Sequence, residues 1–142
     1  MKWSVQAALE SDYYTNICPQ DAKMNNGLWK KIENKARKIA LNYDSVNIVC
    51  GPNFVDTAYG TLGSNKIPIP DYFFKTFLIY THGEYHSIAF LCPNNDDKRA
   101  IDQFALTVNE IEKLTGLDLY PHLDDSPEED IEDFLEYEVW FY

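Results

Sequence analysis

Three side chains of different chemistry lie at regular intervals in the first quarter of the chain. Asn25 is followed eight residues later by Glu33, and Arg37 comes four residues after Glu33. Eight residues are about two turns of an α-helix and four are about one further turn. If this stretch is helical, an amide, a carboxylate and a guanidinium could therefore line up along one flank. This flank is the first candidate for a functional site.

The same residues also have a purely structural explanation. Glu33 and Arg37 are spaced as a helix-surface ion pair, which stabilises a helix by only about 0.2–0.5 kcal/mol. Asn25 is equally suited to cap the helix, because its carbonyl oxygen can accept a hydrogen bond from the free amides of the first turn. Spacing alone leaves both explanations open.

The element that would carry these residues is the clearest helix in the chain. Apolar side chains at helical intervals predict a helix over residues 29–43, and residues 25–27 would form the turn that leads into it. Upstream, residues 2–9 read as a short helix or an extended lead-in. Residues 13–18 read as a strand or as a segment packed below the site.

Strand-forming residues, rich in β-branched and aromatic side chains, dominate the middle of the chain. We expect a short buried strand at 45–50 that ends at Gly51-Pro52. Residues 67–70 contain two prolines and suit an extended edge. Residues 73–80 and 85–92 are predicted to pair as a hairpin across a short turn.

Two more helices are expected toward the C-terminus. The first would begin at Asn109, with Glu112 completing a capping box and Gly116 ending the helix. The second would begin at Ser126. Its single apolar stripe would consist of Ile131, Phe134, Leu135 and Val139. These segments predict an α+β fold, with a mostly antiparallel sheet flanked by helices, as one domain over residues 1–142.

The charge of the chain is unevenly distributed. A net charge of −11 argues against nucleic-acid binding when the chain is taken as a whole. Ten of the 23 acidic residues lie in 118–142, which has no lysine or arginine, and the other 13 nearly balance the 12 bases. Half of the bases lie within residues 23–38, around the candidate site. They form either a nucleic-acid-binding patch or an ordinary solvated helix face, and composition does not decide between the two.

Composition places the chain among globular proteins, with 45% hydrophobic and 15% aromatic residues. No apolar run approaches the ~20 residues that a membrane span requires. The N-terminal stretch lacks the apolar core of a signal peptide, so the chain as given would stay in the cytoplasm. The cysteines, Cys18, Cys50 and Cys92, show no paired spacing, and we expect buried apolar side chains rather than disulfides or a zinc site.

The run from Asn16 to Arg37 carries a more specific pattern. It resembles the second signature block of the DNA/RNA non-specific endonucleases at Asn16, Pro19, Gln20, Asn25, Gly27, Trp29, Glu33 and Arg37. Later segments resemble the same family, among them Gly51-Pro52, residues 73–75 and residues 108–116. The resemblance covers the whole chain, but only the C-terminal part of the family domain.

The resemblance implies a ββα-metal fold, also called a His-Me finger, in an N-terminally truncated form. The family domain carries an earlier Asp-Arg-Gly-His block whose histidine is the general base. This sequence contains no such block and begins at Met1-Lys2-Trp3-Ser4, which in the family follows that block. The resembled enzymes hold a single Mg²⁺, for which Mn²⁺ could substitute, through one asparagine and several waters.

The family's roles transfer position by position. Asn25 matches the metal ligand, Glu33 the carboxylate that orients metal-bound water, and Arg37 the cation that offsets phosphate charge. Asn16 matches a supporting asparagine, whereas Asp12 stands where the family often has another one. The nucleic-acid contacts that we predict are Lys23, Lys30 and Arg37.

The histidines of this chain offer no replacement for the missing base on sequence grounds. His82 and His86 flank the predicted hairpin turn, where their spacing fits either a two-histidine metal pair or two ordinary surface side chains. His122 follows Pro121 in a predicted exit loop. None of the three has a sequence reason to reach Asn25.

The resemblance therefore implies a Mg²⁺-dependent, sugar-non-specific endonuclease that hydrolyses phosphodiester bonds of DNA and RNA. Activity of this chain alone would be impaired, because the group that activates water is missing. The alternative is a catalytically dead relic, or a protein that binds metal or nucleic acid without cleaving it. A third hypothesis, an acidic interaction module, is supported only by the charge of the C-terminal region.

Two further expectations follow from a shortened domain. Loss of strands from the sheet would expose apolar edges, so the chain is expected to be marginally stable, to form a homodimer, or to need the missing half of the domain. We expect no membrane partner. Relatives in the family are often exported, so a secreted or periplasmic location would follow if a signal had been lost with the N-terminal part.

Overall fold

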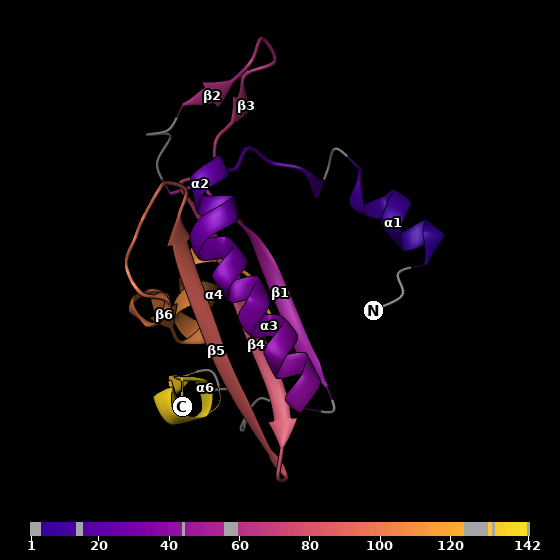
Figure 1. The fold of residues 1–142 in the computed structure, drawn as a ribbon, viewed down its shortest axis with the longest axis vertical. Coiled ribbons are helices and arrows are strands. Elements are labelled where there is room, and N and C mark those ends of the chain that lie inside the picture. Colours follow the sequence, from indigo (N-terminus) through magenta and orange to yellow (C-terminus); the bar gives the residue numbers. More distant parts are fainter. Residues whose placement is uncertain are drawn as a thin grey trace.

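An antiparallel sheet forms the centre of the protein (Figure 1). The computed structural model describes residues 4–13, 16–43, 45–55, 60–123, 131 and 133–141. Within these residues the main sheet has four strands in the order β1-β4-β5-β6. Their bounds are Val46–Asn53 for β1, Tyr72–Thr81 for β4, Glu84–Pro93 for β5 and Ala105–Leu106 for β6. This arrangement confirms the expected α+β fold with an antiparallel sheet.

The sheet is covered on both faces, which explains the nearly continuous apolar run in β4. Alternate side chains of a strand point to opposite faces. Phe73 and Phe77 pack toward the helix α3, Lys30–Asn42, whereas Phe74 and Leu78 pack toward the helix α4, Val108–Thr115. Figure 1 shows α3 and α4 on opposite sides of the strands.

The long helix starts earlier than the sequence predicts. A short α2, Ala22–Met24, leads into the π-helical turn η2, Asn25–Trp29, and then directly into α3. Asp21 is the N-cap, because its side chain accepts hydrogen bonds from the backbone amides of Lys23 and Met24, at 2.8 and 2.9 Å. The expected turn at 25–27 is therefore wrong, and Asn25 does not cap the helix.

The predicted hairpin is confirmed, and the strand before it differs from its prediction. β4 and β5 pair from Tyr72↔Pro93 to Thr81↔Glu84 around a turn at His82 and Gly83. β1 does not end at Gly51-Pro52 but continues to Asn53. A proline is tolerated there because β1 lies at an edge of the sheet, where one side of the strand has no ladder bond to lose. For the same reason β1 is partly exposed rather than buried.

Smaller elements extend from the sheet. The strands β2, Thr61–Leu62, and β3, Ile67–Pro68, pair with each other as a separate ribbon beyond one end of the main sheet (Figure 1). The helix α1, Val5–Ser11, stands away from the sheet (Figure 1). The 3₁₀ helix η4, Ile101–Phe104, precedes β6.

The capping box of α4 lies two residues before its predicted position. Thr107 is the N-cap, and its backbone amide donates a hydrogen bond to the Glu110 carboxylate at 2.9 Å. The predicted box at Asn109 and Glu112 is wrong, because Glu112 instead accepts from the Leu119 backbone amide. Gly116 ends the helix with φ of 70°, as expected.

The C-terminal region forms a shorter helix than predicted. The predicted start at Ser126 lies outside the described residues. The helix α6 spans Tyr137–Phe141, and residues 134–136 are not helical. Phe134 is 66% exposed whereas Trp140 is buried, so the expected single apolar stripe is wrong. None of the helices in the described parts is long and apolar enough to cross a membrane.

Candidate functional site

The π turn decides whether Asn25 and Glu33 share a flank of the helix. In a regular α-helix, eight residues overshoot two turns and would leave the two side chains about 80° apart. A π turn adds about one residue to the helix. Because η2 begins at Asn25, the stretch to Glu33 includes this π turn, and we infer that its eight residues cover close to two whole turns. Helical geometry thus aligns Asn25 with Glu33, and Arg37 follows one turn later.

Asn25 and its neighbour Asn26 differ in what their amides do. The Asn26 side chain donates to the Ala22 carbonyl at 2.8 Å. The Asn25 side chain is exposed and makes no hydrogen bond to any residue that the structure describes. Within the described part of the chain, the exposed carboxamide oxygen of Asn25 therefore has no partner, and such an oxygen is a suitable ligand for a hard cation.

Glu33 lies against a buried lysine rather than against Arg37. Its Oε1 atom is 3.9 Å from the Nζ atom of Lys75, and 40% of the Glu33 side chain is exposed. Arg37 instead donates from Nη1 to Oδ1 of Asn34 at 2.7 Å. The surface ion pair that spacing allowed is thus not formed, and Glu33 and Arg37 act as separate groups on the helix.

Asn16 lies in the lead-in segment and not on the helix. Its side chain donates to the Glu10 carbonyl at 2.8 Å, which ties the lead-in to the end of α1. The residue also lines a groove of about 590 Å³ together with Trp29, Cys50 and Phe73. Asn16 therefore lines a groove together with Trp29 of the helix that carries Asn25 and Glu33, which we call the site helix. Its side-chain amide, however, is hydrogen-bonded to α1.

The basic residues around the site do not form one uniform patch. Lys23 pairs with Asp96 at 3.4 Å and Lys30 is exposed. Lys35 is half-buried, donates from Nζ to the Trp140 carbonyl and lies over the Phe141 ring. Burial, together with the nearby charge of Lys38, lowers the pKa of Lys35. Lys35 therefore attaches the helix to the C-terminal residues Trp140 and Phe141.

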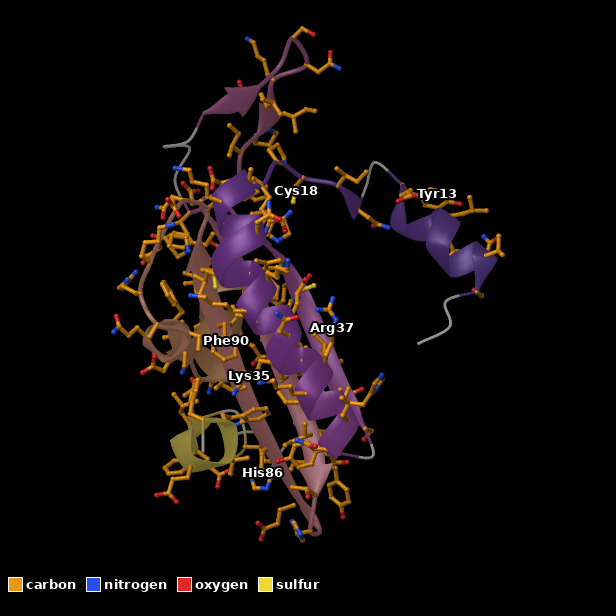
Figure 2. The ribbon with its side chains drawn as sticks, in the orientation of Figure 1. Tyr13, Cys18, Lys35, Arg37, His86 and Phe90 are labelled. Atoms are coloured by element: carbon orange, nitrogen blue, oxygen red, sulfur yellow. The ribbon has the colours of Figure 1, made fainter. Side chains whose placement is uncertain are left out.

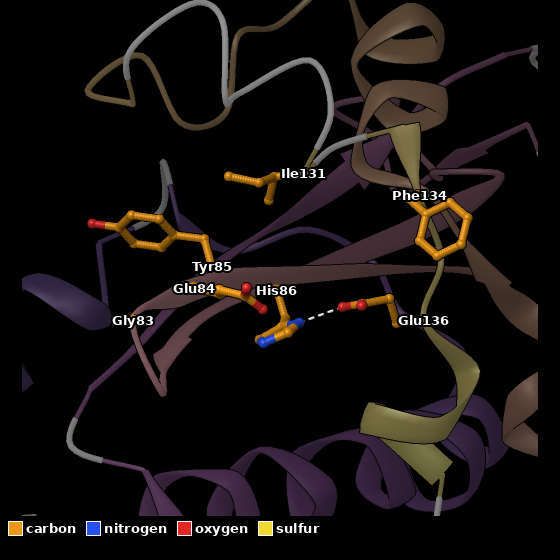
Figure 3. A pocket seen from close by; sticks show the side chains of 7 residues that line it. All are labelled: Gly83, Glu84, Tyr85, His86, Ile131, Phe134 and Glu136. Atoms are coloured by element: carbon orange, nitrogen blue, oxygen red, sulfur yellow. Dashed lines mark hydrogen bonds and ion pairs between the residues drawn. The ribbon is translucent and has the colours of Figure 1, made fainter.

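The histidines lie away from Asn25. Figure 2 shows His86 at the end of the sheet opposite to the lead-in segment that carries Cys18. His86 Nδ1 contacts the Glu136 carboxylate, at the wall of a pocket of about 430 Å³ that Phe134 also lines (Figure 3). His82 Nδ1 is 3.1 Å from the Thr81 hydroxyl, so the two histidines have different partners.

His122 also lies apart from the site helix, because it lines a pocket with Leu119 and Tyr120 on the α4 side of the sheet. Among the described residues, no three or more His, Cys, Asp or Glu side chains gather as a metal-binding group. A cation held by one asparagine and by waters would not need such a group.

Lys75 is the site residue that the sequence interpretation missed. It is the only charged residue of β4, and its Nζ atom lies 4.2 Å from the centroid of the Trp29 ring. The sequence could have indicated Lys75, because it is a lone lysine in an otherwise uncharged predicted strand. If such a strand is covered on both faces, its buried charge needs a partner.

Comparison with known proteins identifies the class. A model of the DNA/RNA non-specific endonuclease family matches residues 1–126, and the chain belongs to this family. The mitochondrial nuclease EXOG of Homo sapiens is 29% identical over 138 residues, which cover 87% of this chain and 38% of EXOG. The nuclease of Serratia marcescens is 36% identical over 119 residues, which cover 80% of this chain and 45% of that nuclease.

A solved structure supports the fold. A crystal structure of the EndoG/EndoGI complex aligns with a TM-score of 0.69 at 21% identity, over 81% of this chain and 52% of that chain. At this level of identity the likeness shows the fold alone. The chain spans about two fifths of the length of the curated relatives that it matches.

Proposed function

We propose that this chain carries the metal-binding side of the active site of a Mg²⁺-dependent endonuclease that acts on DNA and RNA. The single observation that supports this most directly is the π turn at Asn25, whose exposed carboxamide makes no hydrogen bond to the described residues. From this turn we infer that Asn25 lies on the same flank of the helix as Glu33. π turns inside α-helices occur frequently at functional sites. Family membership supplies the reaction class, the hydrolysis of phosphodiester bonds.

The residues present fit a hydrated Mg²⁺ ion. Mg²⁺ binds oxygen ligands and keeps several of its waters, so one amide oxygen with a nearby carboxylate is a suitable set. Mn²⁺ fits the same oxygen ligands. When bound, the ion would stabilise the negative charge that develops on the phosphate. Asn25 would hold it, and Glu33 would accept hydrogen bonds from its waters.

Arg37 and the exposed lysines would handle the nucleic acid. The guanidinium of Arg37 can donate two parallel hydrogen bonds to a phosphate. Lys23 and Lys30 would add contacts to the backbone that carry no sequence information. Asn16 would support the site from the groove beside Trp29. This set of contacts agrees with cleavage that does not depend on sequence or sugar.

The positions of the histidines favour a second candidate function for the chain by itself. His86 lies at the opposite end of the sheet from the lead-in segment, and His122 lies on the α4 side. Neither is placed to deprotonate a water near Asn25. We therefore infer impaired cleavage by this chain alone, with a metal-binding or nucleic-acid-binding protein without activity as the alternative.

Self-association is a further part of the proposal. The outer side of β1 pairs with no strand among the described residues, and Ile48 on this strand is 43% exposed. Free strand edges tend to pair with other chains. We propose that two copies of the chain associate through this edge.

A pair of matched variants tests the metal site. Asn25→Ala should reduce Mg²⁺-dependent nicking of supercoiled plasmid by about 100-fold, because it removes the protein ligand to the metal. Asn26→Ala, one residue away, should leave nicking within about threefold of the unmodified chain, because its amide only bonds the helix backbone. EDTA should abolish nicking, and circular dichroism should report the same helix content in both variants.

The same experiment separates the two candidate functions. If the unmodified chain binds plasmid but does not nick it with Mg²⁺ or Mn²⁺, the chain alone is a binding protein. If Asn25→Ala nicks as fast as Asn26→Ala, then Asn25 is not the ligand and the proposed site is wrong.

A further inference from the structure

Lys75 occupies an unusual position for a lysine. Only 7% of its surface is exposed, and it extends from the central strand β4 toward the same face as Phe73 and Phe77, which is the face that α3 covers. A buried ammonium is costly unless other groups compensate its charge. The groups around Lys75 therefore indicate what the residue does.

Two side chains of one helical turn surround the ammonium. The Trp29 ring lies 4.2 Å from Nζ, and the Glu33 carboxylate lies 3.9 Å away. The thiol of Cys92 is also nearby, but burial raises its pKa to about 12, so it stays neutral at physiological pH. Among the described residues, Glu33 is thus the anion that compensates Lys75.

We propose that Lys75 is a positioning residue, which holds the Glu33 carboxylate toward the metal site from below the helix. This inference rests on the role of Glu33 in the proposed function. The separation of 3.9 Å is longer than a hydrogen bond, so the attraction fixes the carboxylate without occupying its oxygens. Glu33 makes no hydrogen bond to the described residues, and both oxygens stay available to water.

A direct contact between Lys75 and nucleic acid does not fit its surroundings. Its side chain is 9% exposed and its ammonium lies against the Trp29 ring, whereas Lys30 and Arg37 on the helix surface are exposed. A lysine that contacts phosphate contributes to affinity and to its salt dependence. A lysine that positions a reacting carboxylate contributes to turnover instead.

Kinetics on matched variants distinguish these roles. Lys75→Met should lower kcat of Mg²⁺-dependent plasmid nicking by about 10- to 100-fold. This is the usual effect of losing a residue that orients a group beside a metal ion. KM and the salt dependence of DNA binding should change by less than about threefold. Lys75→Arg, which keeps the charge, should recover most of the activity. Lys113→Met, an exposed lysine on α4, is the control and should behave like the unmodified chain.

A second readout does not depend on activity. The ¹³C signal of the Glu33 carboxyl group and the indole signal of Trp29 should both shift in Lys75→Met, stay in place in Lys113→Met, and return toward their original positions in Lys75→Arg. Glu33→Gln changes the exposed member of the Lys75–Glu33 pair. It should shift the Trp29 indole signal, because the Lys75 ammonium beside the ring loses its anion. This variant keeps the test valid if Lys75→Met does not fold.

The outcomes separate this inference from the proposed function. An unchanged Glu33 carboxyl signal in Lys75→Met, or an unchanged Trp29 signal in Glu33→Gln, would overturn the positioning role whatever the kinetics. Weaker DNA binding with a reduced salt slope and an unchanged kcat would also overturn it, since Lys75 would then be a phosphate contact. If the unmodified chain does not nick at all, the proposed activity fails, and the two NMR signals still decide whether Lys75 positions Glu33.

Discussion

The cysteines show at the residue scale how position in the sheet changes the chemistry of one residue type. Cys92 on β5 is fully buried, and burial raises its pKa to about 12. Burial also raises the pKa of the half-buried Cys18. Cys50 on the edge strand β1 is exposed, so the expectation that all three thiols are buried is wrong for Cys50.

These differences predict an order of thiol labelling. Iodoacetamide at pH 8 should modify Cys50 first, Cys18 more slowly and Cys92 only when the chain unfolds. The thiolate is the reactive form, and a thiol with a pKa of about 12 is ionised in about one molecule in 10⁴ at this pH. Peptide mass spectrometry over time measures the order, with Cys50→Ser removing the fast phase. Equal rates for Cys92 and Cys50 would show that β5 is not in the interior.

The residues next to each cysteine in the sequence do not predict which thiol is exposed and which is buried. All three stand among apolar residues, and what differs is the place of each strand in the sheet. Lys75 presents the opposite case, because its isolation among apolar residues was visible but its partners were not. Trp29 and Glu33 lie more than forty residues earlier in the chain, and only the packing of α3 onto β4 brings them to Lys75.

At the scale of elements, the sequence predicted those elements that have a strong apolar repeat. It did not predict where the long helix begins, because two residues compete to cap it. The core of the long helix and the β4–β5 hairpin follow from their apolar repeats. The start of the helix does not, because Asp21 and Asn25 are both good caps. Asp21 is the cap in the structure, and the buried Asn94 helps to fix it by accepting a hydrogen bond from the Asp21 backbone amide at 2.7 Å.

The helix α6 closes the core beneath the site helix, although it lies beyond the residues that match the family. The Trp140 ring is 6.4 Å from the Phe77 ring, and Phe141 is 6.3 Å from Phe90. Lys35 of α3 donates to the Trp140 carbonyl. The helix that carries Glu33 is therefore held from below by this C-terminal element.

Removing Trp140 should loosen that attachment. Trp140→Ala deletes a side chain that is 4% exposed and should lower the free energy of unfolding by about 3–5 kcal/mol in urea titrations. Phe134→Ala is the matched control, because Phe134 is 66% exposed, and its effect should stay within about 0.5 kcal/mol. Hydrogen exchange should speed up in α3 for Trp140→Ala alone. Equal effects of the two variants would place α6 outside the core.

At the scale of the whole molecule, the fold class followed from a run of strands flanked by helices, but the position of each strand in the sheet did not. Sequence patterns do not tell which strands lie at the edges of a sheet, and the strand that was predicted to be buried, β1, is an edge strand. Ile48 on β1 and Val5 on α1 are both exposed apolar residues. Figure 1 shows α1 standing off from the sheet on the side of β1. This side of the molecule is where a second copy would pack.

Two opposing effects govern such an association. Pairing along β1 would satisfy backbone groups at the open edge and cover Ile48. Two chains of net charge −11 repel each other, and salt screens this repulsion over about 8–10 Å. The dimer should therefore become more populated as salt and protein concentration rise.

Light scattering coupled to gel filtration measures this directly. The unmodified chain should approach twice its mass of 16.5 kDa at high concentration, and Ile48→Lys should return it to 16.5 kDa, because a lysine on an edge strand opposes strand pairing. Leu114→Lys is the control, since Leu114 on α4 is 41% exposed, close to the 43% of Ile48, but lies on another element. A monodisperse monomer with a high melting temperature at every concentration would contradict association through β1, and so would equal loss of the dimer in both variants.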